Sequence, residues 1–177
     1  HLKSLSISCL QLSKLPESLW QLKNLTHLSI FSNTLRNLSE SLAQLTNLTD
    51  LKIRGDNINL PEALEPLINL NYLSIDNATS NLPESLGKLI HLKELIIQNT
   101  AITCLPNSLG ELSNLSGLVI YCQQLIELPE SLGLLKNLRT LNISSLSLSF
   151  LPKSIEHLTN LNSLGIASNN MIPDSLG

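Results

Sequence analysis

Residues 115–137 read LSGLVIYCQQLIELPESLGLLKN, and Leu138 then starts the same frame again. Leucine or isoleucine stands at the first, fourth and sixth places of this stretch, and a Leu-Pro-Glu-Ser-Leu segment follows them. The frame recurs every 22 or 23 residues, from starts at Leu2, Leu25, Leu48, Leu70, Leu92, Leu115, Leu138 and Leu161. A period in this range is typical of a solenoid, in which each repeat packs only on its neighbours. Since a solenoid presents one long surface, the pattern favours recognition over chemistry.

Each repeat divides into a strand and a helical turn. The fourth and sixth residues are apolar and alternate with mostly polar ones, as in a strand with one buried face. In the segment that follows, proline is tolerated in a first helical turn, and glutamate suits the positive end of that turn. An asparagine precedes the next strand leucine and is expected to hold a tight turn by bonding its own neighbouring backbone. These asparagines are Asn24, Asn47, Asn69, Asn114, Asn137 and Asn160, with His91 as the exception.

Composition excludes several classes of function. The net charge is −3 and both signs are scattered, so the basic stripe of a nucleic-acid-binding protein is missing. The longest apolar runs are too short to span a bilayer. Cys9, Cys104 and Cys122 form no C-x-x-C pair, and we expect free thiols in a reducing compartment. We therefore expect a cytoplasmic protein, or one secreted into a host cell if it is a bacterial effector. We expect no cofactor, metal, membrane, nucleic acid or small-molecule substrate.

Over essentially the whole chain, the frame resembles the leucine-rich repeat family. Its L-P-x-S-L segment is similar to that of intracellular members, such as Ras-binding scaffolds, plant immune receptors and bacterial effectors. The resemblance implies an α/β fold: a right-handed, curved solenoid of about eight repeats of 22–23 residues. Its parallel sheet would line the concave face, and short helical turns the convex face. Residues 1–177 would form one such domain, and because no polar cap covers either end we expect a fragment of a longer protein.

One column departs from the family pattern. Family members usually carry asparagine at the ninth place, where its amide bonds neighbouring backbone. Here only Asn33 and Asn169 match, among Leu10, Asn33, Asp56, Ala78, Thr100, Gln123, Leu146 and Asn169. The asparagine ladder of the family is therefore mostly missing, and we expect irregular corners.

Large and chemically varied residues gather in the middle of the surface that points away from the core. The third, fifth and seventh places of each repeat face this way, and the terminal repeats fill them mainly with small residues. Tyrosine and arginine are typical of binding hot spots, although exposed strand positions favour aromatic residues in any case. The candidate protein-binding residues are His27, Phe31, Asp50, Lys52, Arg54, Tyr72, Asp76, Glu94, Ile96, Gln98, Val119 and Tyr121.

His27 and Asp50 share a column on adjacent strands, where side chains lie ~5 Å apart. No nucleophile with suitable geometry is evident beside them, so we expect a cross-strand polar pair and no catalytic site. Family members bind proteins on the concave face, and the leading hypothesis is a non-enzymatic interaction module of a cytosolic scaffold or a secreted bacterial effector. The alternatives are the sensor segment of a plant-type nucleotide-binding immune receptor, or the substrate-recruiting domain of a ubiquitin ligase with its catalytic part elsewhere.

Overall fold

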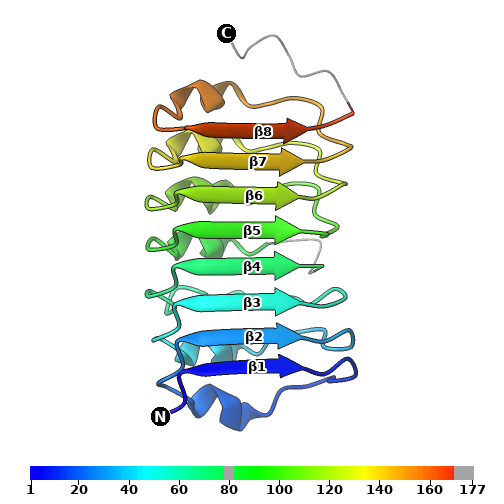
Figure 1. The fold of residues 1–177 in the computed structure, drawn as a ribbon, viewed down its shortest axis with the longest axis vertical. Coiled ribbons are helices and arrows are strands. Elements are labelled where there is room, and N and C mark those ends of the chain that lie inside the picture. Colours follow the sequence, from blue (N-terminus) through cyan, green and yellow to red (C-terminus); the bar gives the residue numbers. More distant parts are fainter. Residues whose placement is uncertain (78–81, 170–177) are drawn as a thin grey trace.

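The computed structural model describes residues 1–77 and 82–169. These residues form one open parallel sheet of eight strands in chain order, so that each repeat adds one strand beside the previous one (Figure 1). The strands are β1 (Ser4–Ser8), β2 (His27–Phe31), β3 (Asp50–Arg54), β4 (Tyr72–Asp76), β5 (Glu94–Gln98), β6 (Gly117–Tyr121), β7 (Thr140–Ser144) and β8 (Ser163–Ala167). The expected solenoid of eight repeats is confirmed.

Strand register keeps equivalent places of all repeats side by side. Leu95 pairs with Leu118, and Ile97 with Ile120, and the same correspondence holds between every two neighbouring strands. Leu118 and Ile120 point inward and have no exposed surface. Because a shift of one residue would turn these side chains to solvent, the apolar columns lock the register. The third, fifth and seventh places therefore form the opposite surface, which we call the sheet face.

The helical turns that the described residues form are all short 3-10 helices. They are η1 (Glu17–Gln21), η2 (Glu40–Gln44), η3 (Glu84–Lys88), η4 (Asn107–Glu111), η5 (Glu130–Leu134) and η6 (Lys153–His157). Each follows an extended residue, which is a proline except for Ser39 before η2. Repeat three forms no such helix where Pro66 interrupts the segment. A proline there removes a backbone donor that a helical turn would need.

Neighbouring turns approach so closely that only glycine fits at some contacts. A Cβ atom added to Gly110 in η4 would lie 2.3 Å from the carbonyl oxygen of Ser131 in η5. Gly87 and Gly133 meet Ser108 and Ser154 in the same way. The small residue thus sets the spacing of the turns, which stack on one side of the sheet (Figure 1).

The frame asparagines bond to the preceding repeat, which corrects the expected role. The side-chain amide of Asn47 donates to the carbonyl of Lys23 at 2.8 Å, and that of Asn137 donates to the carbonyl of Ser113 at 2.7 Å. Asn69, Asn114 and Asn160 make the equivalent bond. These amides satisfy carbonyls that the turns leave free, and they tie each repeat to the one before. The sequence shows the column, but not that its partner lies 23 or 24 residues away.

Replacing His91 by asparagine should complete this inter-repeat ladder. An amide at position 91 would donate to the carbonyl of Ile68, because the spacing equals that of the bond from Asn69 to Thr46. We expect a gain of roughly 0.5–1 kcal/mol in the free energy of unfolding, as for one exposed hydrogen bond. Urea unfolding of the wild type, His91→Asn and His91→Ala measures it. A gain that His91→Ala shares would show that loss of histidine, and not the new bond, is responsible.

In repeats two and seven the corner is held by the residue at the eighth place, whereas the family pattern uses the ninth. Ser32 Oγ donates to the carbonyl of Leu12 at 2.8 Å, and Ser145 Oγ donates to the carbonyl of Leu125 at 2.7 Å. Both serines have no exposed surface. Their hydroxyls therefore satisfy buried carbonyls of the preceding repeat, as the family asparagine would do one residue later. In β5 the corner differs, because Asn99 has a positive φ of 52° and Thr100 at the ninth place is buried.

Glutamates of the L-P-E-S-L segment cap the turn of the next repeat. Glu130 Oε2 accepts from the backbone N–H of Ser154 at 3.1 Å, and Glu84 Oε2 accepts from that of Ser108 at 3.0 Å. The Ser154 N–H lowers the pKa of Glu130, and hydrogen bonding to Ser108 lowers the pKa of Glu84. The expected stabilisation by an acidic residue near a helix start is thus an inter-repeat contact.

This capping predicts a pH-dependent contribution to stability. The folded-state pKa of both carboxyls is depressed, so their contribution is present above the unfolded pKa of about 4.3 and is lost as pH falls through the folded pKa. We expect the double variant Glu84→Gln/Glu130→Gln to lose less stability than the wild type between neutral pH and pH 3. Urea unfolding at both pH values measures this, with Glu127→Gln, an exposed loop glutamate, as control. Equal acid sensitivity of the wild type and the double variant would contradict it.

Candidate functional site

All twelve residues predicted to bind a partner lie on the sheet face of strands β2 to β6. The third place carries His27, Asp50, Tyr72 and Glu94, the fifth carries Lys52, Ile96 and Val119, and the seventh carries Phe31, Arg54, Asp76, Gln98 and Tyr121. They do not form one uniform patch. Strands β2 to β4 hold a network of charged and aromatic residues, and strands β5 and β6 hold an apolar area.

Arg54 joins an aromatic ring to a carboxylate in the seventh column. Its Nε lies 3.2 Å from Asp76 Oδ2, and its guanidinium carbon lies 5.3 Å from the centre of the Phe31 ring. The Arg54 side chain is 66% exposed, whereas that of Asp76 is only 11% exposed. Asp76 Oδ1 also accepts from the Asn99 amide at 2.9 Å. A nearly buried carboxylate with two donors therefore orients an arginine that keeps most of its surface free for a partner.

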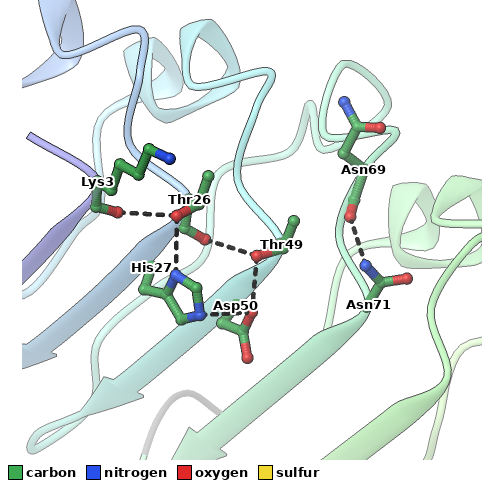
Figure 2. Close-up of polar contacts among 7 residues, drawn as sticks. All are labelled: Lys3, Thr26, His27, Thr49, Asp50, Asn69 and Asn71. Atoms are coloured by element: carbon green, nitrogen blue, oxygen red, sulfur yellow. Dashed lines mark hydrogen bonds and ion pairs between the residues drawn. The ribbon is translucent and has the colours of Figure 1, made fainter. Parts of the chain in front are cut away.

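His27 and Asp50 form the expected cross-strand pair, with Nε2 3.3 Å from Oδ2 (Figure 2). Thr26 Oγ1 lies 2.8 Å from His27 Nδ1, and Thr49 Oγ1 donates to Asp50 Oδ2 at 2.7 Å. Figure 2 shows both threonines flanking the pair just before their strands begin. The pair was expected from its column, but the two threonines were not. Thr26 holds the His27 ring, and Thr49 holds the Asp50 carboxylate. These contacts fix the orientation of the pair, and the His27 side chain is 58% exposed.

Lys52 stands between these two groups and has a different kind of partner. Its ammonium lies 5.3 Å from the centre of the Tyr72 ring on the neighbouring strand, a cation–π contact. Within the described part of the chain, the four ion pairs involve His27, Arg54, Lys88 and His157 as the basic partner, so Lys52 has no carboxylate partner there.

Serines make a shallow groove between the charged columns. A hollow of about 350 Å³ is lined by serines of β1, β2 and β4, together with Lys52, Phe31, Arg54 and Asp76. A second hollow of about 200 Å³ continues from it and shares Ser6, Ser29 and Lys52. The serines are not among the residues expected from the sequence, because those residues were chosen for their large side chains. The signal was nevertheless present, since small residues between large ones in aligned columns leave a depression. The serines in question are Ser6, Ser8, Ser29 and Ser74.

Strands β5 and β6 supply an apolar continuation of the fifth column. Ile96 and Val119 are register partners, and Tyr121 beside them is 42% exposed. The carboxylate of Glu94 lies over Gly117, where an added Cβ would meet Oε2 at 1.9 Å. Glu94 thereby covers Gly117 at the third place of β6. The partly exposed Ile96 and Val119 remain as the apolar surface.

A further hollow of about 570 Å³ lies beside the sheet face, where the chain enters the strands. Thr26 and Thr49 line it together with Lys3, Asn69 and Asn71, which Figure 2 shows on successive repeats. Thr26 Oγ1 lies 3.0 Å from the carbonyl of Lys3, and Thr49 Oγ1 lies 3.0 Å from that of Thr26. Most of its polar groups therefore serve contacts between repeats. This hollow was not expected from the sequence pattern.

Residues 1–77 and 82–169 contain no group of three or more histidine, cysteine or acidic side chains that could hold a metal ion. Within these ranges, no helix has the length and apolar character needed to cross a bilayer. Cys9, Cys104 and Cys122 are free thiols, as expected, and Cys122 is buried against the Thr100 hydroxyl at 3.0 Å. Burial raises the pKa of the Cys122 thiol, which keeps it in the unreactive neutral form.

Comparison with known proteins gives solved structures as relatives, whereas no family model and no curated protein matches the sequence. A leucine-rich repeat protein of Leptospira interrogans is 27% identical over 93% of this chain, with a TM-score of 0.67. The leucine-rich repeat domain of the type III effector XopL is 26% identical over 94% of this chain and 69% of its own, with a TM-score of 0.68. The leucine-rich repeat ectodomain of the Arabidopsis thaliana receptor kinase GASSHO1/SCHENGEN3, in complex with CASPARIAN STRIP INTEGRITY FACTOR 2, is 25% identical. That match covers 98% of this chain and 25% of the receptor chain, with a TM-score of 0.64.

This chain spans about half the length of the Leptospira protein, at 48%. Eight leucine-framed repeats, one strand from each in a continuous parallel sheet, and these likenesses together show that the chain has the leucine-rich repeat fold.

Proposed function

We propose that the protein is a non-enzymatic interaction module whose sheet face binds a protein or peptide partner. The observation that carries the proposal is the groove on β1 to β4, whose walls combine an aromatic-stacked arginine with oriented carboxylates. Aromatic and arginine side chains contribute most to binding at such surfaces, because they give a large contact area at low entropic cost. The twelve residues on strands β2 to β6 are the proposed partner-binding residues.

Likeness to the XopL domain favours the recognition part of a secreted bacterial effector over the other settings. That domain is 26% identical and belongs to a protein named as a type III effector. The plant receptor that resembles this chain was solved with a bound factor, which supports binding in general. A cytosolic scaffold, a sensor segment of a plant-type immune receptor and a recruiting domain of a ubiquitin ligase remain the alternative settings.

Photo-crosslinking tests which surface binds. Random peptides displayed on phage are first selected on the wild-type protein. A benzoylphenylalanine residue then replaces Ser144, which adjoins Tyr121 on the sheet face, or Leu134, which is 60% exposed at the end of η5. We expect the selected peptides to crosslink at position 144 and not at position 134. Crosslinks confined to position 134 would contradict the proposed function.

A further inference from the structure

The fifth column of the sheet face changes its chemistry along the solenoid. It runs from Ser6 and Ser29 through Lys52 and Ser74 to Ile96 and Val119. Small polar residues, one cation and an apolar pair therefore follow one another along a line that crosses the strands at right angles. The part of this line on β1 to β4 is the floor of the groove, because both hollows on the face contain Lys52 with Ser6 and Ser29, and the larger one also contains Ser74. The apolar pair continues the line beyond the groove, on β5 and β6.

Among the described residues, Lys52 is the basic residue on this face that pairs with no carboxylate, so its ammonium is available to a partner. Of the three basic side chains that the described residues place there, His27 faces Asp50 and Arg54 faces Asp76. The two neighbouring carboxylates are engaged by other donors: Asp50 accepts from Thr49, and Asp76 accepts from Asn99. Lys52 instead lies over the Tyr72 ring, which orients the ammonium without neutralising it.

The distance between strands along the fifth column sets the spacing of the side chains that a partner must match. Strands of a sheet lie about 4.8 Å apart, so Lys52 on β3 is ~10 Å from Ile96 on β5 and ~14 Å from Val119 on β6. An extended chain advances about 3.3 Å per residue, so these distances correspond to about three to four residues of partner. Between the two points stands Ser74, which is small enough to leave room for a backbone.

We infer that the partner is an extended peptide segment that crosses the strands and places an aspartate or glutamate on Lys52. Three or four residues along, it places an apolar side chain on Ile96 and Val119. This inference rests on the proposed function and specifies the chemistry of the partner. The carboxylate gains the ammonium of Lys52 and the hydroxyls of the groove serines as donors. The apolar side chain gains the partly exposed surface of the Ile96 and Val119 pair.

Selection on charge-reversed variants tests the inference. Random peptides displayed on phage are selected on the wild type, and the affinity of the best synthetic peptides is measured by fluorescence anisotropy. We expect an acidic residue three or four positions from an apolar one in the selected peptides. Lys52→Glu should weaken them at least about tenfold, and replacing the acidic residue of the peptide by lysine should restore binding to that variant. Ile96→Ser should weaken them as well, whereas Lys14→Glu, an exposed charge reversal outside the sheet face, should not.

The outcomes separate this inference from the proposed function. Peptides that lose affinity with Tyr72→Ala but keep it with Lys52→Glu would overturn the acidic contact and leave sheet-face binding standing. Peptides that are basic at the same place would overturn it too. Peptides whose affinity survives every sheet-face substitution would contradict the proposed function itself.

Discussion

Replacing Leu118 by alanine should lower the free energy of unfolding by about 3 kcal/mol, because the side chain is fully buried between neighbouring repeats and its loss leaves a cavity. Leu118 lies in β6 between Leu95 and Leu141 in the same column, so the layers on both sides lose contacts. Urea unfolding followed by circular dichroism measures the change. Leu134→Ala is the matched control, since that leucine is 60% exposed and its removal should cost less than about 0.5 kcal/mol. Equal losses in both variants would contradict the layered core.

Truncating Tyr72 and Tyr121 together should weaken partner binding by about 2 kcal/mol or more, which raises Kd about 30-fold. Tyr72 supports the Lys52 ammonium, and Tyr121 offers its ring beside the apolar pair on β5 and β6. Fluorescence anisotropy with the peptides selected on the wild type measures the affinity.

Phe150→Ala provides the control for this pair of truncations. Phe150 is 48% exposed but lies in the loop before η6 and not in a strand. Its truncation should leave the affinity within about twofold, since exposed residues outside an interface carry little binding energy. If the double tyrosine variant folds normally and binds as tightly as Phe150→Ala, the assignment of the binding surface is wrong.

The strand pattern could be read from the sequence because the same residue types recur at the same two places of every repeat. Leucine at the fourth place and isoleucine at the sixth recur without exception, so the register and the outward columns follow from alternation alone. The helical turns were also predictable from the L-P-x-S-L segment, and their absence from repeat three is explained by Pro66, which removes a backbone donor.

Contacts between repeats could not be read in the same way. The Asn47 amide bonds the Lys23 carbonyl, and the Glu130 carboxylate bonds the Ser154 backbone, each across about one repeat. From the sequence, both residue types were expected to act within their own turn, since local interactions are the usual role of asparagine and of an acidic residue near a helix start. Only the stacking distance between repeats reveals the longer connection.

In the candidate site, too, the positions of residues could be predicted from the sequence, whereas their contacts could not. Columns placed Phe31 and Arg54 on one face, but their contact also depends on the anchoring of Arg54 by Asp76, itself held by Asn99. The serine groove required knowledge of depth, which one-dimensional patterns of large residues do not carry.

Methyl NMR of a peptide complex tests most directly whether the sheet face binds the partner. The isoleucine and valine methyl groups of the protein are labelled, and the tightest peptide selected on the wild type is titrated in. We predict that the methyl resonances of Ile96 and Val119 shift and saturate together, whereas those of Ile68 and Ile90, exposed in the turns before β4 and β5, stay unchanged. Shifts confined to Ile68 and Ile90, with Ile96 and Val119 unmoved, would contradict it.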